Sequence, residues 1–112
     1  MTDFLVLKSA GFRLQEIFNY TRENWGEEQA RDYIEGMFER FSQIAAREVI
    51  WRPIPAEFEV NGYFSVYEKH YIYWKELSSG QVGIVTVLHE RMHQMERFAA
   101  DLTGSFTEKR ND

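Results

Sequence analysis

The spacing of apolar residues changes once along the chain, and this change restricts the fold more than any other feature of the sequence. Between residues 9 and 45, apolar side chains recur every three or four positions, as on one side of an α-helix. Between residues 63 and 89, short segments rich in β-branched and aromatic residues replace that pattern. Residues 47–60 separate the two halves and carry both prolines, which interrupt helices. The pattern predicts two helices followed by strands.

The helical half divides at Gly26, which can end one helix before the next begins. Ser9 is placed to cap the N-terminus of the first helix. The apolar positions of the first helix are Ala10, Leu14, Ile17, Phe18, Thr21 and Trp25, and those of the second are Ala30, Tyr33, Ile34, Met37, Phe38, Phe41, Ile44 and Ala45. Because the break between the helices is so short, we expect an antiparallel helical hairpin.

Four segments of the sequence are predicted to be strands. They cover residues 3–7, 63–67, 70–77 and 81–89. The last three strands are separated by the pair Glu68-Lys69 and by the run Ser78–Gly80, which are typical of hairpin turns. We therefore predict an α+β fold with the order β-α-α-β-β-β, in which the helical hairpin packs on a mainly antiparallel sheet. Residues 1–103 would form this single domain, and residues 104–112 would form a polar, flexible tail.

Composition excludes several classes of protein. A chain of 112 residues with 44% hydrophobic residues suits one folded domain. Without cysteine it has no disulfide framework and no thiolate zinc site. We find no signal sequence and no apolar run of membrane length, so we expect a cytoplasmic protein without a membrane partner. The net charge of −5 argues against general, phosphate-driven binding of nucleic acid.

Alternation along the last two strands predicts a sheet that is apolar on both faces. In the first of these strands Ile72 and Trp74 would lie on one face and Tyr71 and Tyr73 on the other. In the second strand Val82, Ile84 and Leu88 would lie opposite Val85 and Val87. The helical hairpin can cover only one of these faces. Either the C-terminal segment or a helix of a partner protein would cover the second face, and the sequence leaves both alternatives open.

Three segments together resemble the toxins of the ParE/RelE toxin–antitoxin superfamily. Residues 14–34 match the pattern L-x-x-I-x-x-Y-x-x-x-x-W-G-x-x-x-A-x-x-Y at Leu14, Ile17, Tyr20, Trp25, Gly26, Ala30 and Tyr33. Residues 66–76 resemble a basic hairpin followed by an aromatic strand, and residues 84–92 resemble a last strand followed by H-x-R. The likeness spans roughly residues 3–95. It implies the toxin component of a type II toxin–antitoxin system, with the fold predicted above.

Residues 89–93, HERMH, also fit the H-E-x-x-H pattern of zinc peptidases. In those enzymes the whole pattern lies within one helix, whereas the resemblance places His89 at the end of a strand. In a helix that began near Leu88, both His89 and His93 would point away from the apolar stripe, toward solvent. We therefore interpret this segment as the end of the sheet and expect no metal and no cofactor.

The resemblance supports three alternatives for the activity. ParE-type members inhibit DNA gyrase without chemistry of their own, and this is the interpretation that we favour for this chain. RelE-type members are ribosome-dependent mRNA endoribonucleases, and an inactive member would only bind its antitoxin. In each case the resemblance implies a ParD-like antitoxin in a hetero-oligomer, with operator DNA bound only indirectly through that antitoxin. We predict no catalytic residue.

The resemblance also suggests which residues contact the partners. Those expected to bind the target, grouped at one end of the sheet, are Arg52, Lys69, His70, His89 and Arg91. Trp51, Phe58 and Trp74 are candidates for antitoxin binding, because aromatic residues are enriched in interfaces. Trp51 itself stands where the family has a glycine, in a G-R-x-x-P loop. Ordinary structural roles remain open for all of them, such as a core position for the aromatics.

Overall fold

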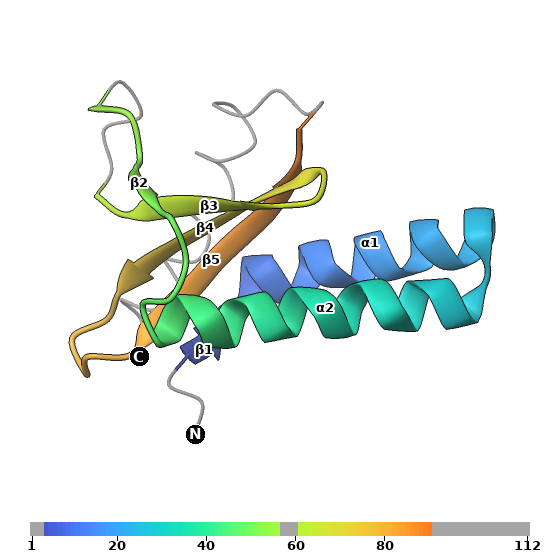
Figure 1. The fold of residues 1–112 in the computed structure, drawn as a ribbon, viewed down its shortest axis with the longest axis horizontal. Coiled ribbons are helices and arrows are strands. Elements are labelled where there is room, and N and C mark those ends of the chain that lie inside the picture. The colour runs from blue at the N-terminus through green and yellow to red at the C-terminus, as the bar shows by residue number, and fades with distance from the viewer. Residues whose placement is uncertain (1–3, 57–60, 91–112) are drawn as a thin grey trace.

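The computed structural model describes residues 4–56 and 61–90, which form two antiparallel helices packed on a five-stranded sheet (Figure 1). The elements are β1 (Phe4–Val6), α1 (Lys8–Trp25), α2 (Glu27–Ala45), β2 (Arg52–Pro53), β3 (Tyr63–Tyr67), β4 (His70–Glu76) and β5 (Val82–His89). The strand order is β1-β5-β4-β3-β2, with β1 parallel to β5 and all other neighbours antiparallel. The predicted α+β fold is confirmed. No described helix is long and apolar enough to cross a membrane.

The helical hairpin turns at Gly26, as predicted. Its φ of 101° lies in the region that favours glycine, and its N–H donates to the carbonyl oxygen of Arg22 at 2.9 Å. Both helices extend beyond the sheet, so the turn projects from the body of the protein (Figure 1). Trp25 was predicted on the apolar stripe, but the residue is 58% exposed, because this end of α1 extends beyond the described strands (Figure 1).

The N-terminus of α1 differs from the prediction. The helix begins at Lys8, and Leu7 occupies the cap position without a side-chain hydrogen bond. Ser9 is therefore inside the first turn and is not the N-cap. Its hydroxyl donates instead to the carbonyl oxygen of Val85, at 2.5 Å, and so joins α1 to β5.

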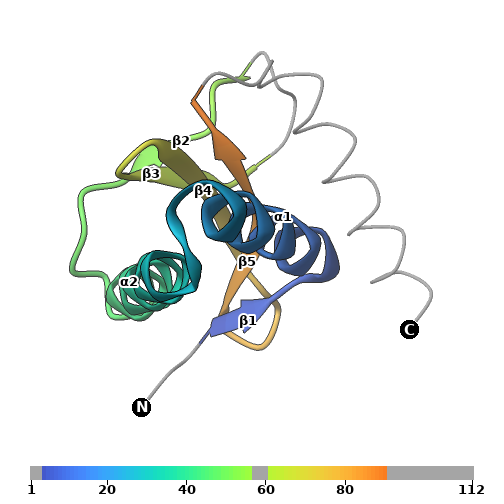
Figure 2. The same ribbon diagram turned by 90° about the vertical axis from the view of Figure 1, so that its right-hand side faces the viewer.

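The helices cover one face of the sheet, and the main core lies between the helices and that face. Buried residues of α1 and α2, among them Leu14, Met37 and Phe41, pack on Ile72 and Trp74 of β4 and on Val82, Ile84 and Val87 of β5. Figure 2 shows the two helices end-on beside the sheet. Tyr73, Val85 and Leu88 belong to a second buried cluster on the opposite face.

The predicted assignment of Leu88 and Val87 to the two faces is wrong, and a β-bulge is the reason. Tyr73 pairs with Thr86 and Trp74 pairs with Ile84, so Val85 is an extra residue in β5. One extra residue reverses the inside-outside alternation for everything that follows it. Val87 therefore faces the helices, and Leu88 faces away. The C-terminal segment, which was one of the two expected covers for this second face, lies outside the described residues.

The proline-containing connection is not entirely irregular. Arg52 and Pro53 form a two-residue strand, β2, which pairs with Phe64 and Tyr63 at the edge of the sheet. The sequence did not predict this strand. Among the described residues β2 is an edge strand, and this position explains how it tolerates a proline, which has no N–H to donate to a further strand.

Candidate target-binding site

The turn between β3 and β4 lies beside the end of β5, and this arrangement brings Lys69, His70 and His89 together. His70 and His89 are directly opposite each other in the paired strands, with ring centroids 5.2 Å apart and planes at 90°. The backbone N–H of Glu90 donates to the carbonyl oxygen of Lys69 at 2.9 Å. Three of the five residues expected to bind the target are thus neighbours. Arg91, the fourth, lies outside the described residues.

Lys69 occupies the exposed second position of a two-residue turn. The first position is Glu68, whose φ of 53° is unfavourable for a residue with a side chain. Glycine or asparagine usually occupies such a position in a hairpin. Backbone strain of this kind persists only where the surrounding structure enforces it, and it is common at functional sites. The turn therefore presents Lys69 in a conformation that the rest of the protein must hold.

His70 is held from inside the protein. Its side chain is 9% exposed overall, and Nδ1 lies 2.7 Å from the hydroxyl oxygen of Tyr33 on α2. Burial, and to a lesser degree the neighbouring His89, lower the pKa of His70 to about 4. The ring is consequently neutral at physiological pH. Its buried position suits a residue that supports the turn better than one that touches a large partner.

The Tyr33 hydroxyl, which contacts His70, has a raised pKa. Burial is the main cause that raises the pKa of Tyr33 to about 12, and Tyr67 and Glu68 contribute in the same direction. A hydrogen bond with the backbone of Lys69 opposes this rise. The hydroxyl is therefore intact at neutral pH and contacts both residues that follow the strained turn position.

A second group of contacts fixes β3 on α2. Arg40 donates from Nη1 to the carbonyl oxygen of Val66 at 2.7 Å, and its guanidinium carbon lies 5.3 Å from the centre of the Tyr67 ring. The Tyr67 hydroxyl approaches the helix at Gly36 so closely that a Cβ there would lie 2.1 Å from the hydroxyl oxygen. Both strands that flank the turn are thus attached to the same helix.

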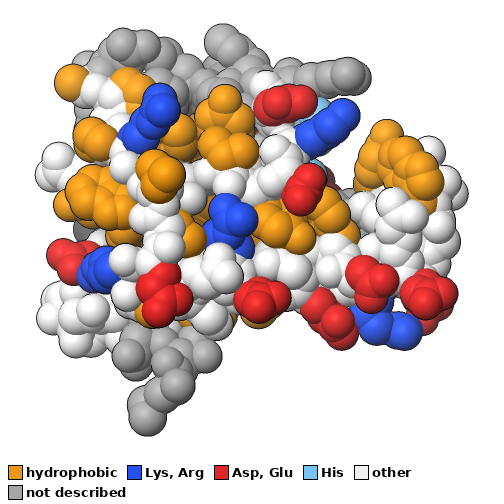
Figure 3. Space-filling view, viewed as in Figure 1, with side chains coloured by type: hydrophobic (Ala, Val, Ile, Leu, Met, Phe, Trp, Pro, Cys, Tyr) orange, Lys and Arg blue, Asp and Glu red, His pale blue; other side chains and the backbone are white. Residues whose placement is uncertain are grey.

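The charge around the turn is nearly balanced in the described residues. Lys69 stands between Glu68 and, across the strand end, Glu90, and all three are exposed. Acidic side chains also follow α2 along the lower edge of the face in Figure 3. Within residues 4–56 and 61–90, this surface has no concentration of positive charge of the kind that attracts a nucleic-acid backbone.

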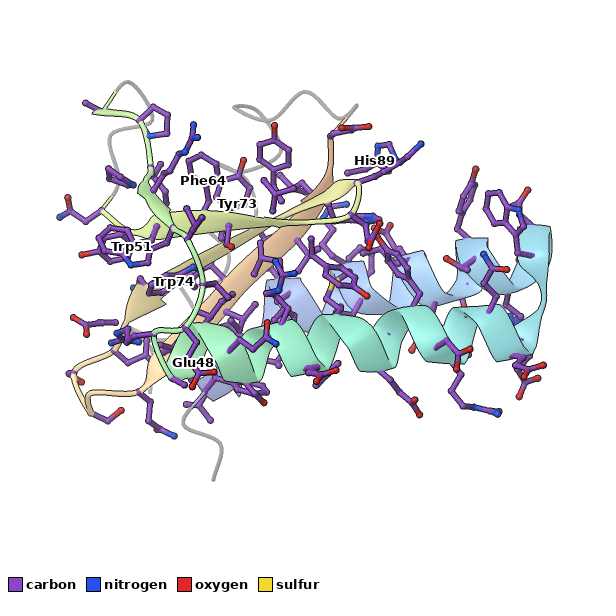
Figure 4. The ribbon with its side chains drawn as sticks, viewed as in Figure 1. Glu48, Trp51, Phe64, Tyr73, Trp74 and His89 are labelled. Atoms are coloured by element: carbon purple, nitrogen blue, oxygen red, sulfur yellow. The ribbon has the colours of Figure 1, made fainter. Side chains whose placement is uncertain are left out.

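Arg52 is not part of this group. It pairs with Phe64, three residues before Tyr67, and β2 lies three strands away from β5. At about 3.4 Å per residue and about 4.8 Å per strand, Arg52 and His89 are roughly 10 Å apart along the strands and roughly 14 Å apart across the sheet. Figure 4 shows Trp51, the neighbour of Arg52, at the end of the sheet opposite His89.

Of the three aromatic residues expected to bind an antitoxin, the structure places two. Trp74 is only 2% exposed and lies beneath Tyr63 and Trp51, with ring centroids 4.8 Å and 6.5 Å away (Figure 4). Its burial makes it a core residue and argues against direct contact with a partner. Trp51 is 45% exposed and packs edge-on against Tyr63 at 4.7 Å. Phe58 lies outside the described residues.

The structure does not support a zinc-peptidase interpretation of residues 89–93. His89 is the last residue of β5 and Glu90 is in a turn, so the motif does not begin within a helix. No group of three or more possible metal ligands occurs within residues 4–56 and 61–90.

The sequence matches the family described as the ParE toxin of the type II toxin–antitoxin system, parDE, over residues 6–94. The chain belongs to this ParE toxin family. It is 31% identical to Toxin ParE of Escherichia coli over 104 residues, which are 93% of this chain and all of that protein. It is 29% identical to Toxin ParE1 of Mycobacterium tuberculosis over 91 residues, which are 80% of this chain and 90% of that protein.

Membership of the ParE family gives the chain a biological class and implies one partner. The chain is a toxin of a type II toxin–antitoxin system, and such a toxin has an antitoxin. The matched region extends from the end of β1 past the end of β5. It therefore includes both strands of the turn that presents Lys69, and all the residues that support that turn.

Sequence reasoning missed the residues behind the turn. Tyr33 was predicted as one position of the apolar stripe of α2 and matched the family pattern, but no role beside the turn was expected for it, and Tyr67 was not singled out. Gly36 did carry a signal, because glycine inside a helix is unfavourable unless something approaches the backbone closely. Here that neighbour is the Tyr67 hydroxyl.

Proposed function

We propose that this ParE-family toxin inhibits DNA gyrase and that a ParD-like antitoxin neutralises it. The surface that contacts the enzyme would be centred on Lys69 and His89, where β3 and β5 end and β4 begins. The observation that carries the proposal is the state of His70. It is buried, its Nδ1 lies 2.7 Å from the Tyr33 hydroxyl oxygen, and burial lowers its pKa to about 4.

A ribonuclease would need a different arrangement at this position. General acid–base catalysis of RNA cleavage requires a group that can exchange protons with a ribose hydroxyl and whose pKa is near the working pH. The pKa of His70 is about 4, and the ring is shielded from a large substrate. Lys69, the exposed cation that precedes His70 in the described part of the chain, has two glutamates for neighbours. These features fit a protein-binding surface better than a nuclease site.

The surface proposed for the antitoxin lies at the other end of the sheet. Ile50 is 86% exposed and Trp51 is 45% exposed, and they precede β2, which is the edge strand of the sheet that the described residues form. An antitoxin segment that orders on binding could cover these residues, with Phe58 as a further candidate. Operator DNA would be bound by the antitoxin. Gyrase acts in the cytoplasm, which would then be the compartment of this toxin.

Supercoiling by purified gyrase tests the proposal. Relaxed plasmid, ATP and gyrase are incubated with increasing toxin, and the concentration for half inhibition is measured. We expect inhibition by the wild-type toxin, its removal by the antitoxin, and at least about tenfold weaker inhibition by Lys69→Ala, which corresponds to about 1.4 kcal/mol. Arg31→Ala is the matched control, since it removes one exposed positive charge from α2.

A parallel reaction distinguishes a ribonuclease toxin from a gyrase inhibitor. Translating ribosomes are incubated with the same toxin preparation, and the messenger RNA is examined for cleavage. Unchanged supercoiling together with cleaved RNA would reject the gyrase proposal. No effect in either reaction would indicate a chain that only binds its antitoxin.

A further inference from the structure

We propose that Tyr33 and His70 are positioning residues for target binding: their hydrogen bond holds the β3–β4 turn on α2 so that Lys69 keeps one orientation. This inference rests on the proposed function for its consequence in gyrase inhibition. Its structural half, the control of the turn by a tyrosine hydroxyl, can be measured without any target.

The hydrogen bond connects the turn to an element that is distant in sequence. Tyr33 and His70 are 37 residues apart, and His70 is the residue immediately after Lys69. The tyrosine ring also packs on both flanks of the turn, with centroids 5.4 Å from Tyr67 and 5.6 Å from His70. One helix side chain thus contacts the last residue of β3 and the first residue of β4.

The chemistry of the pair suits a fixed support. Both groups are neutral at physiological pH, because burial lowers the pKa of His70 and raises that of Tyr33. The hydrogen bond is partly buried, so water competes with it less than with a fully exposed one. The pair therefore holds the turn without a charge that could be screened by salt.

The turn needs such a support on this side. Glu68 has a strained backbone with φ of 53°, and neither Glu68 nor Lys69 is buried. The preceding strand is held by Arg40, which donates to the carbonyl oxygen of Val66. At the start of β4, the Tyr33 hydroxyl is hydrogen-bonded to His70. The Glu90 N–H donates to the Lys69 carbonyl oxygen. Loss of the tyrosine hydroxyl would leave His70 without its polar contact to α2.

A set of near-isosteric variants tests the proposal. Tyr33→Phe removes only the hydroxyl. His70→Asn keeps a polar atom near the position of Nδ1, whereas His70→Gln moves the amide toward the position of Nε2. Tyr63→Phe is the control, because it removes one hydroxyl from the same sheet at the end paired with Trp74. Thermal unfolding of each variant establishes that it is folded.

Two measurements are made on the folded variants. The first is hydrogen exchange of the Glu90 amide, which donates to the carbonyl oxygen of Lys69 and so reports the position of the turn. The second is the toxin concentration that gives half inhibition of gyrase. Exchange of an amide in central strand β5, that of Ile84, serves as the internal reference.

We expect Tyr33→Phe and His70→Gln to increase exchange at Glu90 about tenfold relative to Ile84, and to weaken inhibition by a similar factor. His70→Asn should keep both the exchange rate at Glu90 and the inhibition of gyrase close to those of the wild type. Tyr63→Phe should change neither quantity. Unchanged exchange in Tyr33→Phe would overturn the structural half. Faster exchange with unchanged inhibition would overturn the role in target binding. If wild-type toxin does not inhibit gyrase at all, the proposed function fails, while the exchange result still decides the role of the hydroxyl.

Discussion

The Ser9 hydroxyl of α1 donates a hydrogen bond to the carbonyl oxygen of Val85, the residue that bulges from β5, at 2.5 Å. The two residues are 76 positions apart. A bulge leaves backbone groups out of the regular pairing, and a buried carbonyl without a donor is costly. The Ser9 hydroxyl thus provides a donor for the carbonyl group at the bulge. The bulge in turn places Val87 toward the helices and Leu88 toward the opposite face.

Replacing Ser9 by alanine should destabilise the toxin by about 1 to 2 kcal/mol, because the Val85 carbonyl loses its donor. Urea unfolding followed by circular dichroism measures the change. Ser42→Ala, at an exposed position of α2, is the control and should alter stability by less than about 0.5 kcal/mol. Equal stability of both variants would mean that the hydrogen bond does not support the bulge.

Gly36→Ala should destabilise the fold even though alanine favours helix formation. The new Cβ would lie 2.1 Å from the Tyr67 hydroxyl oxygen, so the tyrosine must move, at an expected cost of about 1 to 3 kcal/mol. Gly11→Ala in α1 is the matched control, because nothing lies within 4 Å of its Cβ. That variant should gain up to about 1 kcal/mol.

A double variant checks the cause of the Gly36 effect. Tyr67→Phe removes the hydroxyl oxygen, after which the nearest ring atom is 3.2 Å from the new Cβ. The cost of Gly36→Ala should therefore be at least about 1 kcal/mol smaller in the Tyr67→Phe background. An identical cost in both backgrounds would contradict the contact.

The strain at Glu68 predicts that glycine is the better residue there. Glu68→Gly should raise the free energy of unfolding by up to about 1 kcal/mol relative to Glu68→Ala, since both lack the carboxylate but only glycine accommodates a φ of 53° without strain. The comparison uses urea unfolding at one pH. Greater stability of the alanine variant would argue against the turn conformation.

The low pKa of His70 predicts a loss of stability in mild acid. In the unfolded chain this histidine has its ordinary pKa of 6.5, whereas in the folded protein the value is about 4. Between these two pH values the unfolded state binds a proton that the folded state does not, so stability falls as pH decreases through this window. Above pH 6.5 the contribution is complete, and below about pH 4 no more is lost from this group. The total is about 3 kcal/mol.

His70→Asn isolates this contribution, because asparagine does not titrate. Unfolding free energies of both proteins are measured from pH 7 to pH 4. The wild type should lose about 3 kcal/mol more than the variant over this range. Parallel curves would show that His70 titrates in the folded state as it does in the unfolded chain.

The sequence predicted both helices and four of the five strands, because each of these depends on local periodicity, and it missed the two-residue strand β2. The break at Gly26 and the turn at Glu68-Lys69 are examples in which a short motif determines the local chain path. The bulge at Val85 was not predictable from alternation, since a one-residue insertion is visible only when the partner strand is known. For the same reason the faces of Val87 and Leu88 were exchanged.

The candidate site was predicted only in part. Lys69, His70 and His89 follow one another around the turn and strand end, so their proximity follows from the predicted hairpins. Arg52 was expected beside them, but its position depends on the register of a two-residue edge strand that the prolines conceal. The contact of Tyr33 with His70 depends on how the helical hairpin sits on the sheet. Helical spacing identifies which side of α2 faces inward, and it does not identify the partner.

The most direct test of the central claim is the amount of linear plasmid DNA that gyrase leaves when the reaction is stopped with a denaturant. Purified gyrase, ATP and plasmid are incubated with this toxin, free of antitoxin. We predict that linear DNA accumulates in proportion to the toxin, that the antitoxin abolishes it, and that Lys69→Ala reduces it at least about tenfold. Wild-type toxin that yields no linear DNA and leaves supercoiling unchanged would contradict the account.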